Sequence, residues 1–210
     1  MSSVSGADRS RVVRVVAGES GSEDDAALVT AVRARLPRAA GRLWDRHSVT
    51  VRRVLRRILG PFEDVEDAVQ EAFLRLFREL ESLHDPSALR SLLIGITLLV
   101  AKSELRRRRG KLWLTPSADR ALAEPGCHDD THHLELRVAL VQLYRVFDRV
   151  GIDHRFAFVL YYVEGVELSE LSAVLGCSLA ATRSRVADAA NRVCSLAAKD
   201  PLLAPYLSLS

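Results

Sequence analysis

Cysteine is scarce in this chain of 210 residues. The three that occur, Cys127, Cys177 and Cys194, are widely spaced and odd in number. An odd, scattered set argues against a disulfide framework and suits a reducing compartment. We therefore expect a cytoplasmic protein whose fold does not depend on disulfide bonds.

Long hydrophobic runs are also missing. The densest apolar stretch, Leu92 to Ala101, is ten residues long, whereas a membrane span needs about 18 or more. The stretch from Met1 to Glu19 lacks the order of charge, apolar block and cleavage site that marks a signal peptide. We expect no membrane insertion.

Lysine is rare among the 30 basic residues: only Lys102, Lys111 and Lys199 are lysines, and the rest are arginines. The net charge of +3 is mild, and the sequence pI is near 9.0. Arginine carries a planar head with several donors, which suits phosphates and guanine edges. The composition permits nucleic-acid binding without establishing it.

Catalytic and metal-binding patterns are lacking as well. No nucleophile–base or carboxylate pair stands at catalytic spacing, so we expect no enzyme, no cofactor and no small-molecule substrate. Cys127-His128 and His132-His133 lie close together. Their spacing fits no standard zinc pattern, and we assign no metal site to them.

What the chain does have is helical periodicity over most of its length. We predict an all-α fold with two small helical domains joined by a flexible linker. Ser, Gly and acidic residues at the N-terminus favour disorder, and Pro116, Pro125 and Gly126 mark the linker. The predicted boundaries are 1–25 for a disordered extension, 26–112 for the first domain, 113–133 for the linker, 134–198 for the second domain and 199–210 for a tail.

The most informative helix is predicted from Pro61 to Leu80. Its buried face repeats at i, i+3, i+4 and i+7, and comprises Val65, Ala68, Val69, Ala72, Phe73, Leu76, Phe77 and Leu80. The opposite face carries an acidic stripe, defined as Asp67, Gln70, Glu71 and Leu74. Such a stripe is either a solvated face or a docking surface, with the leucine as anchor and the acids selecting a basic partner.

The next helix is predicted from about Ala88 to Arg109, with Gly110 as its C-cap. It ends in four consecutive arginines, Arg106 to Arg109. They either complement the helix dipole or contact a phosphate backbone.

The second informative pattern lies in the C-terminal half. Glu167 to Leu175 reads as a short helix, Gly176 to Ser178 as a tight turn, and Leu179 to about Cys194 as a helix with Arg183, Arg185 and Arg192 outward. This describes a helix-turn-helix, which places its second helix in the DNA major groove. Two helices joined by glycine also occur in plain bundles.

Together these stretches resemble the bacterial RNA polymerase sigma factors of the sigma-70 family, specifically the extracytoplasmic-function (ECF) group. Asp64 to Phe77 resembles the motif of region 2.2, Leu92 to Arg109 the helix of regions 2.3 and 2.4, and Glu167 to Arg185 region 4.2. The resemblance implies a region 2 bundle, a region 4 helix-turn-helix, and promoter-directed transcription initiation by core polymerase.

The resemblance also implies three sets of site residues. For docking on the polymerase clamp helices it implies Asp64, Asp67, Gln70, Glu71, Phe73 and Leu74. For the −10 element it implies His84, Asp85, Ser87, Leu92, Leu99, Lys102, Ser103, Arg106, Arg107, Arg108 and Arg109. For the −35 element, with the polymerase flap nearby, it implies Ala181, Thr182, Arg183, Ser184, Arg185, Asp188 and Arg192.

Some of these positions depart from the family pattern. Leu92 and Leu99 replace a frequent Trp and Asn, while Ala181 and Thr182 replace Thr-Val. Asp188 stands where the family favours arginine, and would repel phosphates unless it accepts from a cytosine amine or pairs with an arginine. The promoter sequence therefore does not carry over.

Two other functions fit parts of this pattern. One is a helix-turn-helix transcriptional regulator that acts without core polymerase. The other is a sigma remnant that titrates an anti-sigma factor, a partner that the resemblance also implies for an active sigma factor.

Overall fold

The computed structural model describes residues 22–61, 63–112 and 131–207, and within these ranges every regular element is a helix. The α-helices are α1 (Ser22–Arg33), α2 (Ala39–Leu59), α3 (Glu66–Glu79), α4 (Leu89–Leu112), α5 (Thr131–Val150), α6 (Ile152–Phe158), α7 (Leu168–Leu175), α8 (Leu179–Ala197) and α9 (Ala204–Leu207). A 3-10 turn, η1 (Pro86–Ala88), precedes α4, and a π-helical turn, η3 (Val159–Val163), follows α6. The predicted all-α fold is confirmed.

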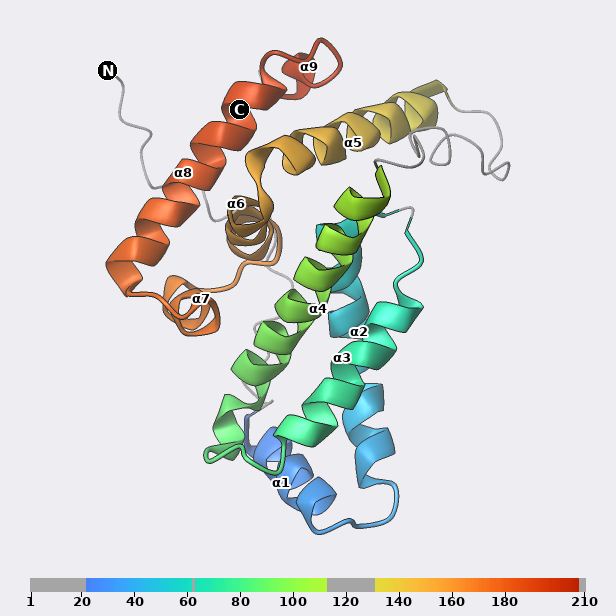
Figure 1. Cartoon of the computed structure of the whole chain (residues 1–210), viewed down its shortest axis with the longest axis vertical. Helices are drawn as coiled ribbons and strands as arrows, with labels where there is room; N and C mark the ends of the chain where they lie inside the picture. Colours follow the sequence, from blue (N-terminus) through green and yellow to red (C-terminus); the bar gives the residue numbers. More distant parts are fainter. Residues whose placement is uncertain (1–21, 62, 113–130, 208–210) are drawn as a thin grey trace.

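The N-terminal helices α1 to α4 pack around the apolar faces of α2, α3 and α4 (Figure 1). All eight residues predicted for the buried face of α3 are buried or partly buried. Phe73 is 1% exposed and its ring lies 4.4 Å from that of Trp44 on α2. This packing fixes the rotation of α3 about its axis.

The C-terminal helices form a second layer, in which α8 packs on α5, α6 and α7. Their core includes Phe147, Phe156, Leu160, Leu171 and Val186. The two groups of helices also pack on each other: α4 lies beside α6 and α7, and η3 contacts α2 (Figure 1). Their buried residues form one continuous apolar cluster.

Several helix boundaries differ from the sequence prediction. Helix α1 begins at Ser22, within the segment predicted to be disordered, and α3 begins at Glu66 rather than at Pro61. The cause at α3 is local, because the Asp64 carboxylate accepts the backbone N–H of Glu66 at 3.0 Å and closes a turn before the helix.

Glycine and proline also act differently from the prediction at two places. Helix α4 continues through Gly110 to Leu112, so Gly110 is not a C-cap; glycine inside a helix costs only about 1 kcal/mol relative to alanine. Helix α9 follows Pro201, within the stretch 199–210 that was predicted to be a tail, and Leu203 before this helix is 7% exposed against the core. Helix α5 begins at Thr131, inside the linker predicted at 113–133. Residues 113–130 of that linker and residues 1–21 of the extension predicted at 1–25 lie outside the described residues.

Candidate functional site

The acidic stripe of α3 is on the surface, as the periodicity predicts. Asp67 and Gln70 are exposed, Glu71 is half-buried, and Leu74 exposes 53% of its surface. Glu71 pairs with Arg75 one turn later at 2.7 Å. Phe73, placed by the family pattern in the same set, lies in the core and cannot touch a partner; it supports the stripe from beneath.

The N-terminus of α3 is held by a bidentate ion pair. Arg52 of α2 donates from Nε to Glu66 Oε1 at 2.7 Å and from Nη2 to Oε2 at 2.8 Å. Hydrogen bonding from Arg52 holds the pKa of Glu66 below its ordinary value. Asp64 is exposed directly before this point. The pair therefore orients the acidic end of the helix toward solvent.

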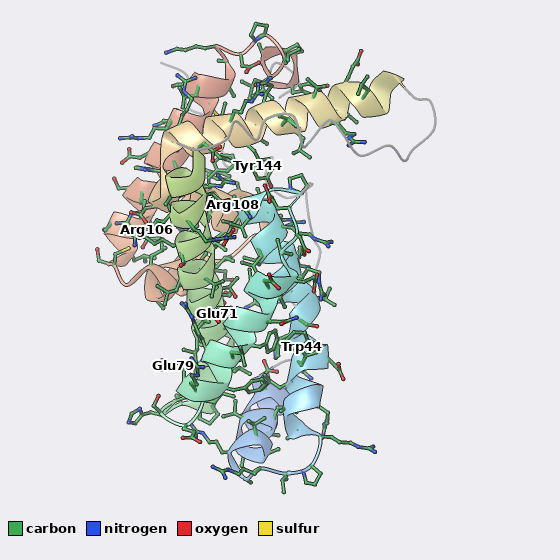
Figure 2. The ribbon with its side chains drawn as sticks, turned by 45° about the vertical axis from the view of Figure 1, so that its right-hand side comes forward. Trp44, Glu71, Glu79, Arg106, Arg108 and Tyr144 are labelled. Carbon is green, nitrogen blue, oxygen red and sulfur yellow. The ribbon has the colours of Figure 1, made fainter. Side chains whose placement is uncertain are left out.

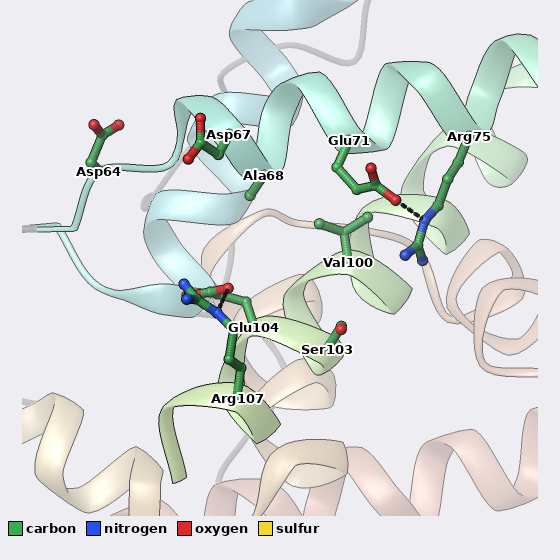
Figure 3. Close-up of a pocket in the computed structure, with 9 residues that line it drawn as sticks. All are labelled: Asp64, Asp67, Ala68, Glu71, Arg75, Val100, Ser103, Glu104 and Arg107. Atoms are coloured by element: carbon green, nitrogen blue, oxygen red, sulfur yellow. Dashed lines mark hydrogen bonds and ion pairs between the residues drawn. The ribbon is translucent and has the colours of Figure 1, made fainter. Parts of the chain in front are cut away.

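A groove of about 380 Å³ runs between α3 and α4 beside the stripe (Figure 3). Its floor is apolar, from Ala68 and Val100. Its rim consists of charged and polar side chains, which are Asp64, Asp67, Glu71, Arg75, Ser103, Glu104 and Arg107. The groove thus joins the acidic stripe of α3 to α4, whose exposed residues the family resemblance assigns to the −10 element.

The loop before α4 is ordered by a side-chain turn. Asp85 accepts the backbone N–H of Ser87 at 2.9 Å and its hydroxyl at 2.7 Å. These bonds hold the pKa of Asp85 below its ordinary value. His84, Asp85 and Ser87 are all exposed. The loop therefore presents its polar groups to solvent in a fixed shape.

The residues assigned to the −10 element on α4 do not form one cluster. Leu92, Leu99, Ser103 and Arg106 share a stripe, because they are spaced by seven, four and three residues. Leu99 is 59% exposed on this stripe, whereas Leu92 is half-buried. From the start of α4 to Arg106 the helix rises about 26 Å, so the loop and the arginines lie at opposite ends of a long surface.

The run of arginines is mostly occupied within the chain. Arg107 and Arg108 both bind Glu104, at 2.6 and 3.0 Å, and Arg108 also reaches Glu63 at 3.2 Å. Hydrogen bonding from the arginines holds the pKa of Glu104 below its ordinary value. Arg106 is exposed (Figure 2), and the side chain of Arg109 lies outside the described residues. Of the three arginines described, Arg106 is thus the most available for a phosphate.

The helices α7 and α8 have the geometry predicted for a helix-turn-helix. Gly176 adopts a left-handed conformation, with φ of 62°, between them. Ser178 caps α8 by accepting the N–H of Ala181 at 3.2 Å. The first turns of α8 expose Ala181, Arg183 and Ser184, and further along the helix Asp188 and Arg192 are exposed as well. These residues form a polar face on the outside of the molecule.

Thr182 was assigned to the same DNA-reading set, and the structure places it elsewhere. Its side chain is fully buried, donates to the carbonyl of Ser178 at 3.0 Å and lies 3.1 Å from Cys177 Sγ. It therefore secures the turn rather than reading a base. Arg185 is half-buried at the edge of the exposed face.

Lys102, assigned to the −10 element, faces the C-terminal helices. Its Nζ lies 3.1 Å from Asp153 of α6. Near the start of the same helix, Arg90 pairs with Glu170 of α7 at 2.8 Å. One part of the assigned promoter surface is thus engaged inside the chain.

Sequence reasoning missed the residues that join the two groups of helices. Glu164 binds Arg53 and Arg57 of α2, at 3.2 and 2.6 Å, and Tyr144 donates its hydroxyl hydrogen to the carbonyl of Arg57 at 2.9 Å. The one available signal was Glu164 itself, a lone acid in an otherwise apolar and aromatic stretch.

Within the described ranges, no group of three or more His, Cys, Asp or Glu residues could hold a metal ion, and no helix is long and apolar enough to cross a membrane. Cys127 and His128 lie outside those ranges, as do the side chains of His132 and His133.

The fold and these surfaces define a helical protein of the helix-turn-helix class. Residues 43–111 match the family model described as Sigma-70 region 2. The chain is 31% identical over 150 residues to the ECF RNA polymerase sigma factor SigE of Mycolicibacterium smegmatis, a match that covers 68% of this chain and 57% of SigE. It is 30% identical over 154 residues to the probable RNA polymerase sigma factor RfaY of Xanthomonas campestris, covering 72% of this chain and 38% of RfaY.

A solved structure, that of CnrH in complex with the cytosolic domain of CnrY, resembles the fold with a TM-score of 0.59 at 24% identity, covering 82% of this chain and 96% of that one. The chain is thus similar in sequence to ECF sigma factors of the sigma-70 family, and the resemblance expected from its motifs is confirmed. The chain spans 57% and 38% of the lengths of SigE and RfaY.

Proposed function

We propose that this protein is a sigma factor, which binds core RNA polymerase in the bacterial cytoplasm and directs it to promoters. The observation that carries the proposal is the acidic stripe, a solvent-facing row on a helix whose other face is buried. An exposed leucine among acids suits a partner helix that offers an apolar pocket and basic side chains. The clamp helices of the polymerase are the proposed partner.

The promoter would be read at two places. The loop at His84 to Ser87 and the stripe of Leu99, Ser103 and Arg106 would meet the −10 element. Flipping a base out of the DNA duplex costs a few kcal/mol. Stacking of that base on the protein and contacts to the phosphates must offset this cost.

The exposed face of α8, through Arg183, Ser184 and Arg185, would enter the −35 major groove. When both DNA contacts are held on one enzyme, the first raises the effective concentration of the second, so the overall affinity exceeds that of either contact alone. The chemistry of RNA synthesis would remain that of the polymerase.

An anti-sigma factor is the proposed regulator. CnrH, whose fold this chain shares, was solved with the cytosolic domain of CnrY. A second protein of that kind would compete with polymerase for the exposed surfaces of this chain. Co-purification from the native bacterium would identify it.

The proposal is tested by reconstituted transcription with core polymerase. We expect initiation at discrete promoters, and we expect Glu71→Lys to lower core binding by reversing charge within the stripe. Glu79→Lys is the matched control, because Glu79 is exposed at the C-terminal end of the same helix, two turns beyond Glu71 and outside the stripe (Figure 2). Both residues are on the surface, so neither change should alter the fold. Unchanged core binding by Glu71→Lys would refute the docking model.

A further inference from the structure

A second cleft, of about 360 Å³, lies between the end of α5 and the second half of α8. Its base is formed by Val150, which is buried, and Leu196, which is half-buried. Its rim consists of exposed polar side chains, which are Arg149, Asn191, Arg192 and Ser195. Of these residues only Arg192 was singled out by sequence.

The cleft continues the exposed face of α8. Residues seven apart lie on the same side of a helix, so Asn191 follows Ser184 and Arg192 follows Arg185. Ser195 follows Asp188 in the same way. Seven residues correspond to a rise of about 10.5 Å. The cleft therefore lies about two turns beyond the residues proposed to read bases.

The two arginines of the rim have no ion-pair partner among the described residues. The acid beside Arg149 in the sequence, Asp148, binds Arg155 instead at 2.8 Å. Asp188, one turn before Arg192, makes no ion pair with it in the described part of the chain. Guanidinium groups that are not neutralised within a chain favour an anionic ligand, and phosphate matches their planar donors.

We infer that this cleft binds a phosphate of the DNA backbone beside the segment that α8 reads. The inference rests on the proposed function and adds Arg149, Asn191 and Ser195 to its DNA contacts. The major groove is about 12 Å wide, so a helix whose first turns meet base edges brings its surface about 10.5 Å further on to the groove wall. Contacts of this kind set position and orientation without reading sequence.

The test measures binding of the full chain to a fluorescent duplex of mixed sequence over a range of salt concentrations, without polymerase. Each lost phosphate contact lowers the slope of log affinity against log salt by about 0.9. We expect that reduction for Arg149→Gln and for Arg192→Gln, equally on all duplexes. The matched control is Arg145→Gln, which removes the same charge from an exposed position one turn earlier on α5. Equal melting temperatures of all variants would exclude a change in folding as the cause of a changed slope.

Four outcomes would overturn the inference. The first is a slope for Arg149→Gln equal to that for Arg145→Gln, and the second is no duplex binding by the unmodified chain. The third is calorimetric binding of inorganic phosphate that Arg149→Gln abolishes without a change in the duplex slope, which would assign the cleft to a free anion. The fourth is loss of core polymerase binding by Arg149→Gln with the slope unchanged, which would make the cleft a protein contact. Failure of promoter-directed transcription would be seen separately, because this assay contains no polymerase.

Discussion

Glu164 and Arg57 are 107 residues apart in the chain, and their carboxylate and guanidinium lie 2.6 Å apart. The Glu164 side chain is only 5% exposed, and Arg57 also donates to the carbonyl of Val163 at 2.9 Å. With Arg53 on the other carboxylate oxygen, at 3.2 Å, one acid holds two arginines of α2. This cluster closes the N-terminal helices onto the C-terminal ones.

The proposed function requires this cluster to open. The −10 and −35 elements are centred about 25 base pairs apart, or about 85 Å at 3.4 Å per base pair, whereas a compact chain of this length has a radius of gyration of about 17 Å. Replacement of Glu164 by arginine brings three guanidinium groups together, and we expect the helices to separate. Small-angle X-ray scattering should show a larger radius of gyration for Glu164→Arg, but not for Glu135→Arg on the exposed part of α5. Identical radii would contradict a closing role for Glu164.

Leu74 should matter for binding and not for folding. It is 53% exposed, and exposed substitutions usually change stability by no more than about 0.5 kcal/mol. A buried interface anchor contributes about 2 kcal/mol or more, so Leu74→Ala should weaken core polymerase binding by roughly 30-fold at an unchanged melting temperature. Val49→Ala, at an apolar position of α2 that is 64% exposed, is the control. Equal affinities of the two variants would rule out an anchor.

Ser178 should contribute to stability through its cap. Its hydroxyl accepts the N–H of Ala181 at the start of α8, and loss of such a cap costs about 1 kcal/mol. Ser178→Ala should therefore lower the free energy of unfolding by about that amount in urea titrations. Ser178→Asp supplies another capping oxygen and should retain most of it. A destabilised aspartate variant would show that the cap is not the cause.

His47 should make the stability depend on pH. Burial lowers its pKa below the ordinary value of 6.5, against the raising effect of Asp25, whose Oδ1 lies 3.2 Å from Nε2; Arg46 and Arg90 add to the lowering. The unfolded chain then binds the proton more readily than the folded one. Stability should be full above about pH 6.5 and decline as the pH falls below it, until the folded pKa is passed.

The measurement is the free energy of unfolding at about pH 7.5 and about pH 5.5. His47→Gln should remove part of the difference between the two values. An undiminished pH dependence in His47→Gln would assign it to other groups.

Much of the candidate site was readable from the sequence, because it depends on local periodicity. The spacing of apolar residues in α3 predicted which face is buried, and therefore predicted that Asp67, Glu71 and Leu74 lie on the surface. The family motif, and not the spacing, misassigned Phe73 and Thr182, because it groups both with surface residues. Their burial follows from contacts, with Trp44 in one case and with the turn at Ser178 in the other.

The sequence by itself determined the all-α fold, the exposed stripe of α3 and the helix-turn-helix, since helix period and turn chemistry are properties of neighbouring residues. Only the tertiary structure decided which basic side chains are engaged with distant parts of the chain. It pairs Arg57 with Glu164, Lys102 with Asp153 and Arg108 with Glu63, and it forms the cleft at Arg149. Ion pairs between helices depend on how apolar faces far apart in the sequence pack together, and no local sequence pattern predicts which residues will pair.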